Sequence, residues 1–196
     1  MNKLTGKINS SDVLVLMALP SESQGLFEAA GIAVHYSGIG KINAAMKTME
    51  LIMRLQPKQI LNLGTAGSHK FKTHELIECS AFVQKDMDIT PLGFPLGQTP
   101  LDDIPGKIEV STLTKLKKGI CGTGDVFEIG PPRLACDLVD MEAYAIAKVC
   151  KKMQVELTAI KYITDGSDPH SKDDWIKNLQ PASESLFRIY QEIVQL

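Results

Sequence analysis

Two acidic clusters each follow an apolar, strand-like run, and this is where α/β proteins place their chemistry. One run ends just before Asp165, and the other ends just before the triplet Asp-Met-Glu at 140–142. Ligand sites of such proteins lie beyond the carboxyl ends of the strands, so the two ends can converge on one pocket. Asp also favours turns and helix N-caps, and Asp165 and Asp168 fit that structural interpretation as well.

A further carboxylate, Glu22, follows the first strand-like run. That run is Val13 to Met17, and the Pro and Ser residues after it predict a short helix through Phe27, capped by Ser21 or Ser23. A carboxylate in the first turn stabilises the positive end of a helix. Taken alone, Glu22 is therefore expected to be structural.

The composition is that of a soluble globular protein. The chain has 196 residues with 44% hydrophobic and 22% charged residues, which predicts a single domain over 1–196. A net charge of −2 gives no electrostatic reason to expect nucleic acid or an anionic membrane as a partner. Residues 1–12 lack a signal-peptide core and no apolar run is long enough to span a membrane, so we expect a cytoplasmic protein.

Neither a metal nor a cofactor is expected. The cysteines form no CxxC pair and have no matching histidine spacing, which predicts buried reduced thiols; they are Cys79, Cys121, Cys136 and Cys150. Gly38 and Gly40 resemble the start of a dinucleotide fingerprint, but Asn43 occupies its last glycine position. Tight packing of a strand on a helix explains the two glycines equally well.

Strands and helices alternate along the whole chain. The expected strands are 13–17, 32–36, 59–63, 76–83, 108–111, 120–123, 135–139 and the run from Val155. The expected helices are 42–55, 143–152 and 175–194. This order predicts an α/β fold with a central mixed β-sheet flanked by helices on both faces. The first long helix has an apolar face expected to pack inward, made of Ile42, Ala45, Met46, Met49, Ile52 and Met53.

Two further segments are expected to be irregular. The small residues 64–68 predict a loop whose backbone N–H groups can approach a ligand, or a tight turn. Residues 91–105 contain four prolines and two glycines, which predicts an extended excursion. Its apolar residues Leu92, Phe94 and Leu96 would cover either the core of the chain or a second subunit.

Five short motifs occur in one order. They are Ser-Gly-Ile-Gly-Lys at 37–41, Asn-Leu-Gly-Thr-Ala-Gly at 62–67, Gly-Asp-Val-Phe at 124–127, Asp-Met-Glu-Ala at 140–143 and Ile-Thr-Asp at 163–165. Together they resemble the purine nucleoside phosphorylase/nucleosidase superfamily, most closely its 5′-methylthioadenosine/S-adenosylhomocysteine nucleosidases. The resemblance implies a nucleoside phosphorylase-like three-layer fold and hydrolysis of a purine N-glycosidic bond, with a small-molecule purine nucleoside as partner.

The resemblance also implies roles for the three carboxylates. Asp165 matches the general acid that protonates N7 of the leaving base, a task that requires a dry pocket or a neighbouring carboxylate to keep its proton. Glu142 matches the residue that binds the ribose hydroxyls, and its charge can stabilise the developing positive sugar. Glu22 aligns with the residue that holds and activates the attacking water.

Further residues are implied in substrate binding. Phe127 matches the aromatic side chain that packs on the base, and the backbone around Glu128 would read the base edge. Trp175 lies either near the 5′-alkylthio group or in the core as the anchor of the last helix. Lys161 replaces an arginine and is expected to orient Asp165. The remaining implied residues are Leu19, Ile39, Thr65, Ala66, Gly67, Met141 and Thr164, the last in place of a serine.

The sequence leaves two questions open, the identity of the attacking nucleophile and the oligomeric state. The first turn carries Glu22 and no arginine, which favours water over phosphate as the nucleophile. Leu92 and Phe94 match a segment that completes a neighbour's pocket, so a homodimer is implied. The alternatives are a phosphorylase or nucleosidase for another purine nucleoside, futalosine-like or inosine-like, and a nucleoside-binding protein without catalysis. Two shortened segments, 27–37 and 98–108, leave the 5′-substituent preference open.

Overall fold

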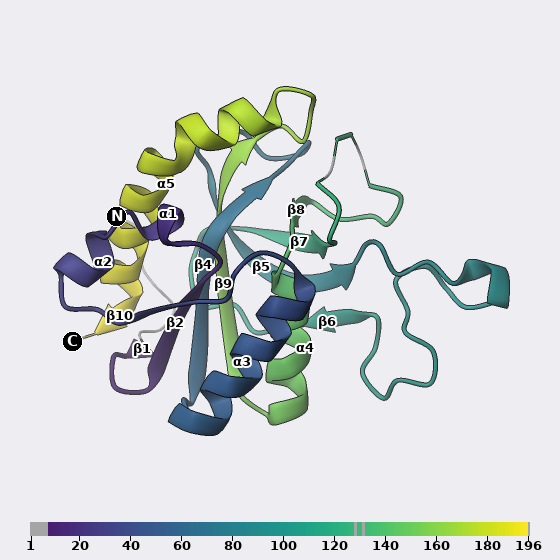
Figure 1. The fold of residues 1–196 in the computed structure, drawn as a ribbon, viewed down its shortest axis with the longest axis horizontal. Helices are drawn as coiled ribbons and strands as arrows, with labels where there is room; N and C mark the ends of the chain where they lie inside the picture. Colours follow the sequence, from purple (N-terminus) through teal and green to yellow (C-terminus); the bar gives the residue numbers. More distant parts are fainter. Residues whose placement is uncertain (1–7, 128, 131, 196) are drawn as a thin grey trace.

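The computed structural model describes residues 8–127, 129–130 and 132–195, and within them the chain forms an eight-stranded mixed sheet (Figure 1). Its strands are β2 (Val13–Met17), β3 (Val34–Tyr36), β4 (Gln59–Gly67), β5 (Leu76–Gln84), β6 (Lys107–Glu109), β7 (Lys117–Thr123), β8 (Leu138–Asp140) and β9 (Glu156–Asp165). The helices are α1 (Pro20–Ser23), α2 (Leu26–Ala29), α3 (Lys41–Leu55), α4 (Ala143–Met153) and α5 (Ser171–Ile193). Two short strands, β1 (Ile8–Asn9) and β10 (Val194–Gln195), pair in parallel beside the main sheet.

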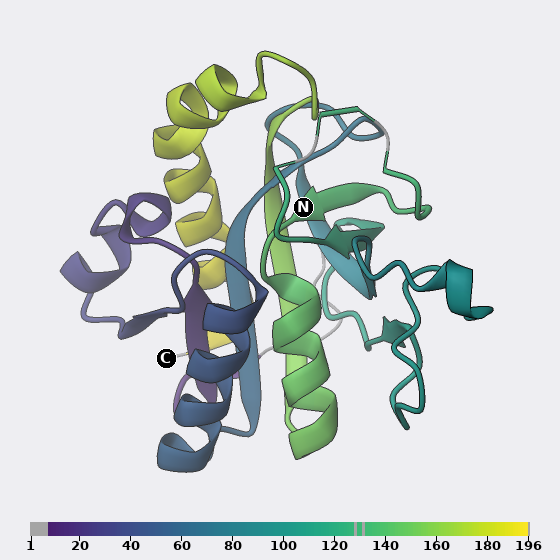
Figure 2. The same cartoon turned by 45° about the vertical axis from the view of Figure 1, so that its right-hand side comes forward.

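Helices cover the sheet on both faces, as expected. Helices α3 and α4 lie on one face, and α5 lies with α1 and α2 on the other (Figure 2). Successive residues of β2 point to opposite faces, so Leu16 packs in the core under α3 and α4 while Met17 packs in the core under α5. The central mixed sheet between two helical layers is the predicted architecture.

The sheet closes on itself near its centre. Strand β9 pairs with both β4 and β5, β5 pairs with β7, β7 with β8, and β8 meets β4 where Val139 lies opposite Gly67. Strand β4 is parallel to β9, and a register shift at its end places Gly67 opposite Asp165. The carboxyl ends of β4, β8 and β9 therefore meet at one pole of the sheet, which brings together the two acidic clusters of the sequence.

Two predicted boundaries are wrong for local reasons. The segment expected to be a loop after Leu63 continues β4 to Gly67, because its backbone pairs with β9 and that pairing needs no large side chain. The short helix expected through Phe27 is two helices, separated by Gln24 and Gly25 with φ of 52° and 72°. Neither serine caps α1; its N-cap position is Leu19.

The predicted apolar face of α3 is wrong in part, since Ile52 is buried and Ala45 packs against the core, but other members are exposed. The buried residues of this helix are Ala44, Thr48, Leu51 and Ile52. Thr48 is tolerated inside because its hydroxyl donates to the carbonyl oxygen of Ala44 at 2.7 Å. Ile42, Met46 and Met53 are instead 73%, 68% and 68% exposed. The helix therefore carries an apolar stripe on its outer surface that the described part of the chain does not cover.

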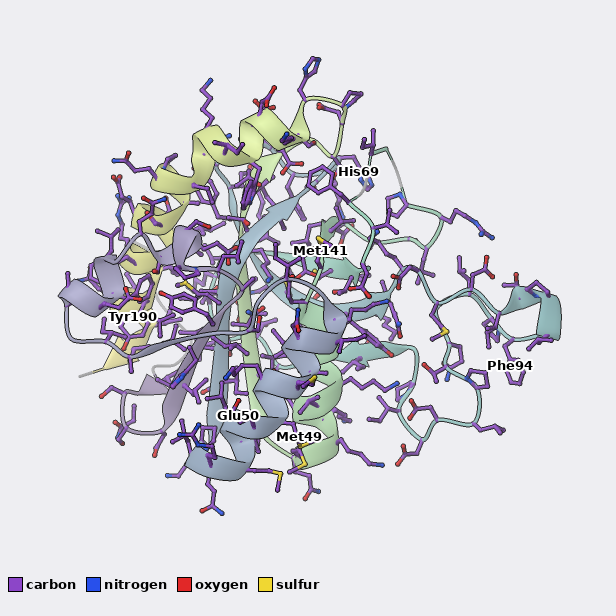
Figure 3. The ribbon with its side chains drawn as sticks, viewed as in Figure 1. Met49, Glu50, His69, Phe94, Met141 and Tyr190 are labelled. Carbon is purple, nitrogen blue, oxygen red and sulfur yellow. The ribbon has the colours of Figure 1, made fainter. Side chains whose placement is uncertain are left out.

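The proline-rich excursion is irregular apart from one 3-10 turn, η1 (Thr90–Leu92), and it projects from the body of the molecule (Figure 1). Leu92 is 74% exposed, so it does not cover the core of its own chain. Phe94 lies on this projecting segment, well away from Met141 at the strand ends (Figure 3).

All four cysteines are free, and Cys79, Cys121 and Cys150 are buried. Over the described residues, no group of His, Cys, Asp or Glu side chains is arranged to hold a metal ion. No helix in the same residues has both the length and the apolar character that crossing a membrane requires.

Candidate active site

The pole where the strands end holds a cavity of about 210 Å³. Glu22, Glu142 and Asp165 all line it, although Glu22 is far from the other two in the chain. The three carboxylates are only 4%, 8% and 5% exposed. The fold thus gathers three buried acidic side chains around one space, which Met141 also lines. Met141 lies where the strands end (Figure 3).

Asp165 is held in place at the end of β9. Its Oδ2 atom accepts a hydrogen bond from the Thr164 hydroxyl at 2.8 Å, and Oδ1 accepts one from the Ser167 backbone N–H at 3.0 Å. A Cβ atom at Gly67 would lie 2.6 Å from Oδ1, so the close approach of β4 to this carboxylate requires glycine. Asp168 is exposed and accepts from the His170 N–H at 2.8 Å. Both carboxylates therefore accept from the N–H two residues further on, as the turn interpretation predicts, but of the two it is Asp165 that lines the cavity.

Glu22 connects the end of β2 to the end of β4. Its Oε2 accepts from the backbone N–H groups of Ala18 at 3.0 Å and Leu19 at 3.2 Å. Its Oε1 accepts from both the backbone N–H and the hydroxyl of Thr65, each at 2.8 Å. Glu22 lies in the first turn of α1 and accepts from the N–H of the N-cap residue Leu19, as the structural interpretation predicts. It is also buried and bridges two strands, which that interpretation did not predict.

Glu142 stands between β8 and α4 and accepts a hydrogen bond from the Gly40 backbone N–H at 2.8 Å. Gly40 has a φ of 95°, a conformation that favours glycine, and this is what turns its N–H toward the carboxylate. Burial, and next the negative charge of Asp140, raise the pKa of Glu142 to about 7. This side chain therefore changes charge near neutral pH.

The raised pKa of Glu142 gives a testable dependence of stability on pH. The contribution of protonated Glu142 to the free energy of unfolding is fully present below the unfolded pKa of 4.5, and it is lost as pH rises through about 7. The Glu142→Gln variant has no carboxyl group to titrate at this position, so it does not lose this stability as pH rises. Its amide oxygen can still accept from the Gly40 N–H. Relative to wild type, the variant should therefore gain about 2 kcal/mol between about pH 5 and about pH 8.5. Urea unfolding at the two pH values measures this, and parallel curves for the two proteins would contradict it.

Lys161 does not orient Asp165, which corrects the expectation from the sequence. Its ammonium lies 3.0 Å from Asp140 Oδ2, and both side chains are buried. Burial lowers the pKa of Lys161, but the negative charge of Asp140 outweighs this and raises it, so the lysine stays charged. Asp140 also accepts from the Ala143 N–H at 3.0 Å. The pair therefore anchors the start of α4, directly after Glu142.

The other expected residues are placed as follows. The cavity is lined by Leu19, Ile39, Thr65, Ala66, Gly67, Phe127, Met141, Thr164 and Trp175. Phe127 and Ile39 are 52% and 49% exposed, so they lie at its mouth. Trp175 is half-buried, lines the cavity and donates from its indole N–H to the Thr65 hydroxyl at 3.1 Å, so it is not a fully buried core anchor. Glu128 lies outside the described residues.

Sequence reasoning missed part of the lining, namely Ala18, Lys85, Val126, Val139, Asp140 and Ser167. Lys85 directly follows β5, so the rule that sites lie beyond strand ends could have found it. It is 8% exposed and donates to the Val126 carbonyl oxygen at 3.3 Å. Asp140 belonged to the acidic triplet, but the sequence did not show that it pairs with Lys161.

Comparison with known proteins places the chain in a family. A family model described as the phosphorylase superfamily matches residues 23–195. The chain is 30% identical over 183 residues to the 5′-methylthioadenosine/S-adenosylhomocysteine nucleosidase of Anoxybacillus flavithermus (strain DSM 21510 / WK1), covering 81% of this chain and 78% of that protein. It is 26% identical over 193 residues to the nucleosidase of the same name from Marinomonas sp. (strain MWYL1), covering 87% and 84%. The chain belongs to the phosphorylase superfamily.

Solved structures share the fold at lower identity. The Helicobacter pylori 5′-methylthioadenosine/S-adenosylhomocysteine nucleosidase with butyl-thio-DADMe-Immucillin-A has a TM-score of 0.84 at 22% identity, covering 96% of this chain and 98% of that one. The futalosine hydrolase of Helicobacter pylori also has a TM-score of 0.84 at 22% identity, covering 92% and 96%. These similarities confirm the nucleoside phosphorylase-like fold expected from the sequence.

Proposed function

We propose that this protein hydrolyses the N-glycosidic bond of a purine nucleoside, namely 5′-methylthioadenosine, S-adenosylhomocysteine or both. The products are adenine and a 5-substituted ribose. The observation that carries this proposal is the convergence of Glu22, Glu142 and Asp165 on one buried cavity. The nucleosidase names of the curated relatives support the substrate.

The proposed roles follow from what bond cleavage requires. Asp165 donates a proton to N7, so the base leaves as a neutral molecule. Glu142 binds the ribose hydroxyls and, when ionised, stabilises positive charge on the sugar. Phe127 packs on the base at the mouth, and Met141 lies against the ribose. Asp165 and Glu142 come from different strand ends, β9 and β8, so a nucleoside can lie between them.

Glu22 is proposed to take a proton from the attacking water. A phosphate at the same place would meet its negative charge, which disfavours phosphorolysis. No arginine lies among the described residues that line the cavity. Arg54 and Arg133 pair with Glu50 and Asp88 instead. Lys85 is the lining residue that carries a cationic side chain, and it follows β5, whereas Glu22 follows β2.

An assay for free base tests the substrate and the nucleophile together. The protein is incubated with 5′-methylthioadenosine, S-adenosylhomocysteine, adenosine and inosine, with and without phosphate. Release of adenine from the first two without phosphate is the expected result. A strict requirement for phosphate would identify a phosphorylase, and release of base from inosine alone would identify another purine nucleoside as the substrate. Binding without turnover would leave a nucleoside-binding protein.

A homodimer is part of the proposal. The exposed stripe of α3, made of Ile42, Met46 and Met53, is apolar, and large exposed apolar patches mark interaction sites. The stripe leads to the pocket mouth, because the Lys41 N–H bonds the Asp125 carboxylate at 2.8 Å, two residues before Phe127. A second copy packed there could use Leu92 and Phe94 of the projecting excursion to close the cavity.

Charge on this stripe is expected to separate the subunits. The double variant Ile42→Glu, Met46→Glu keeps helix-forming residues but places carboxylates in the proposed interface. Its mass by light scattering should fall from twice 21.4 kDa to 21.4 kDa. Ile176→Glu, which changes a 54% exposed isoleucine on α5, should leave the mass unchanged. A wild type of 21.4 kDa would rule out the dimer.

A further inference from the structure

Three side chains from distant parts of the chain form a continuous hydrogen-bonded relay at the cavity. The Trp175 indole N–H donates to Thr65 Oγ1 at 3.1 Å, and the Thr65 hydroxyl donates to Glu22 Oε1 at 2.8 Å. Trp175 belongs to α5, Thr65 to β4, and Glu22 to α1. All three line the cavity. The relay thus connects the start of the last helix to the carboxylate assigned to water.

The chemistry of the groups fixes the direction of this relay. An indole N–H can only donate, whereas a hydroxyl has one proton and two acceptor positions. The Trp175 N–H therefore occupies an acceptor position of Thr65 and leaves the single hydroxyl proton for the opposite side. On that side lies Glu22.

Glu22 is already fully bonded in this arrangement. Within the described residues it accepts four hydrogen bonds, two on each oxygen. Three donors are backbone N–H groups, which the ends of β2 and β4 hold fixed. The fourth is the Thr65 hydroxyl, whose proton can turn about its C–O bond. A water molecule that gives its proton to Glu22 needs an acceptor position, and the hydroxyl is the donor that can release one.

We propose that Trp175 is a positioning residue that acts through Thr65 to place the attacking water on Glu22. The water takes the place of the hydroxyl proton on Oε1, donates one hydrogen bond to Glu22, and accepts one from Thr65. One of its lone pairs then remains for the sugar carbon. Because the indole N–H holds the Thr65 oxygen, the hydroxyl proton stays on the side of the water. This inference rests on the proposed hydrolysis.

Kinetics of a double-mutant cycle test the relay. Trp175→Phe keeps an aromatic ring in the cavity and removes the N–H, so kcat should fall about three- to tenfold, as for loss of one hydrogen bond, with a smaller change in KM. Thr65→Val removes the hydroxyl that Trp175 acts through. In that background Trp175→Phe should have no further effect on kcat, whereas in Thr65→Ser it should retain its effect. Equal effects of Trp175→Phe in wild type and Thr65→Val, or an effect on KM alone, would overturn the proposal.

A spectroscopic readout is independent of turnover. Trp175 is the sole tryptophan of the chain, so a proton–nitrogen NMR spectrum contains one indole N–H signal. Thr65→Val should shift this signal, while Thr65→Ser should leave it near its wild-type position. Thr48→Val removes a buried hydroxyl in α3, bonded to Ala44, and serves as the matched control. An unshifted signal in Thr65→Val would overturn the relay even in an active enzyme. If Thr65→Val shifts the signal but the protein cleaves no nucleoside, the Trp175–Thr65 hydrogen bond is supported and the proposed function is rejected.

Discussion

Replacing Asp165 by Asn is expected to lower kcat by about 10²- to 10⁴-fold, the usual contribution of a general acid. The amide cannot deliver a proton to N7, so the base must leave as an anion. The local structure can accept the change. The Asn oxygen takes the Ser167 N–H, and the Thr164 hydroxyl can accept from the amide while donating to the Ala66 carbonyl oxygen, 3.3 Å away. Affinity for a nucleoside analogue should therefore persist.

The turn after β9 supplies a matched control for this variant. Asp168→Asn makes the same chemical change three residues further on, at an exposed side chain that does not line the cavity. Its kcat should stay near that of wild type. Adenine release at saturating substrate, together with analogue binding by calorimetry, separates the chemical step from binding. Wild-type turnover in Asp165→Asn would show that Asp165 is not the general acid.

Replacing Glu22 by Gln is expected to lower kcat by a similar factor of about 10² to 10⁴, because an amide cannot take a proton from water. The buried position adds a cost that the sequence did not predict. Four donors converge on the carboxylate, and a Gln amide nitrogen would face N–H groups and could not accept from them. The free energy of unfolding should fall by about 1 to 3 kcal/mol.

Loss of activity and loss of stability can be separated in this variant. Urea unfolding gives the free energy of unfolding, and turnover is then measured at a temperature where the variant is folded. Glu28→Gln, an exposed glutamate on the neighbouring α2 that bonds Tyr36 and Ser23, is the control and should retain activity. A folded Glu22→Gln with wild-type turnover would show that this carboxylate only joins β2 to β4.

The pocket depends on how the strands close as much as on the residues themselves. Asp165 lies opposite Gly67 because β4 and β9 shift register at their ends, and Val139 reaches Gly67 because β8 meets β4 there. The contact with Asp165 would fail with a larger residue at 67, where a Cβ atom would lie 2.6 Å from both Asp165 Oδ1 and Ser167 Oγ. The small residues of this segment are therefore a condition for bringing the acidic ends together.

Much of the fold followed from local patterns in the sequence. The apolar run at Val13–Met17 was predicted with its correct bounds, and the alternation of strands and helices gave the layers. Both signals are local, since a strand or helix must bury a face whose period is visible in the sequence. The same reasoning misplaced part of the inner face of α3, because Thr48 satisfies its hydroxyl on its own helix and can be buried in place of Met46.

The sequence by itself determined which carboxylates could do chemistry, because their types and their places after apolar runs are local properties. Only the tertiary structure decided their surroundings. It showed that Glu22 is buried under four donors, that Lys161 pairs with Asp140, and that Trp175 reaches Thr65. Apart from the bonds that Glu22 accepts from Ala18 and Leu19, these contacts join residues tens of positions apart or more. They depend on register and on closure of the sheet, and no spacing along the chain encodes either.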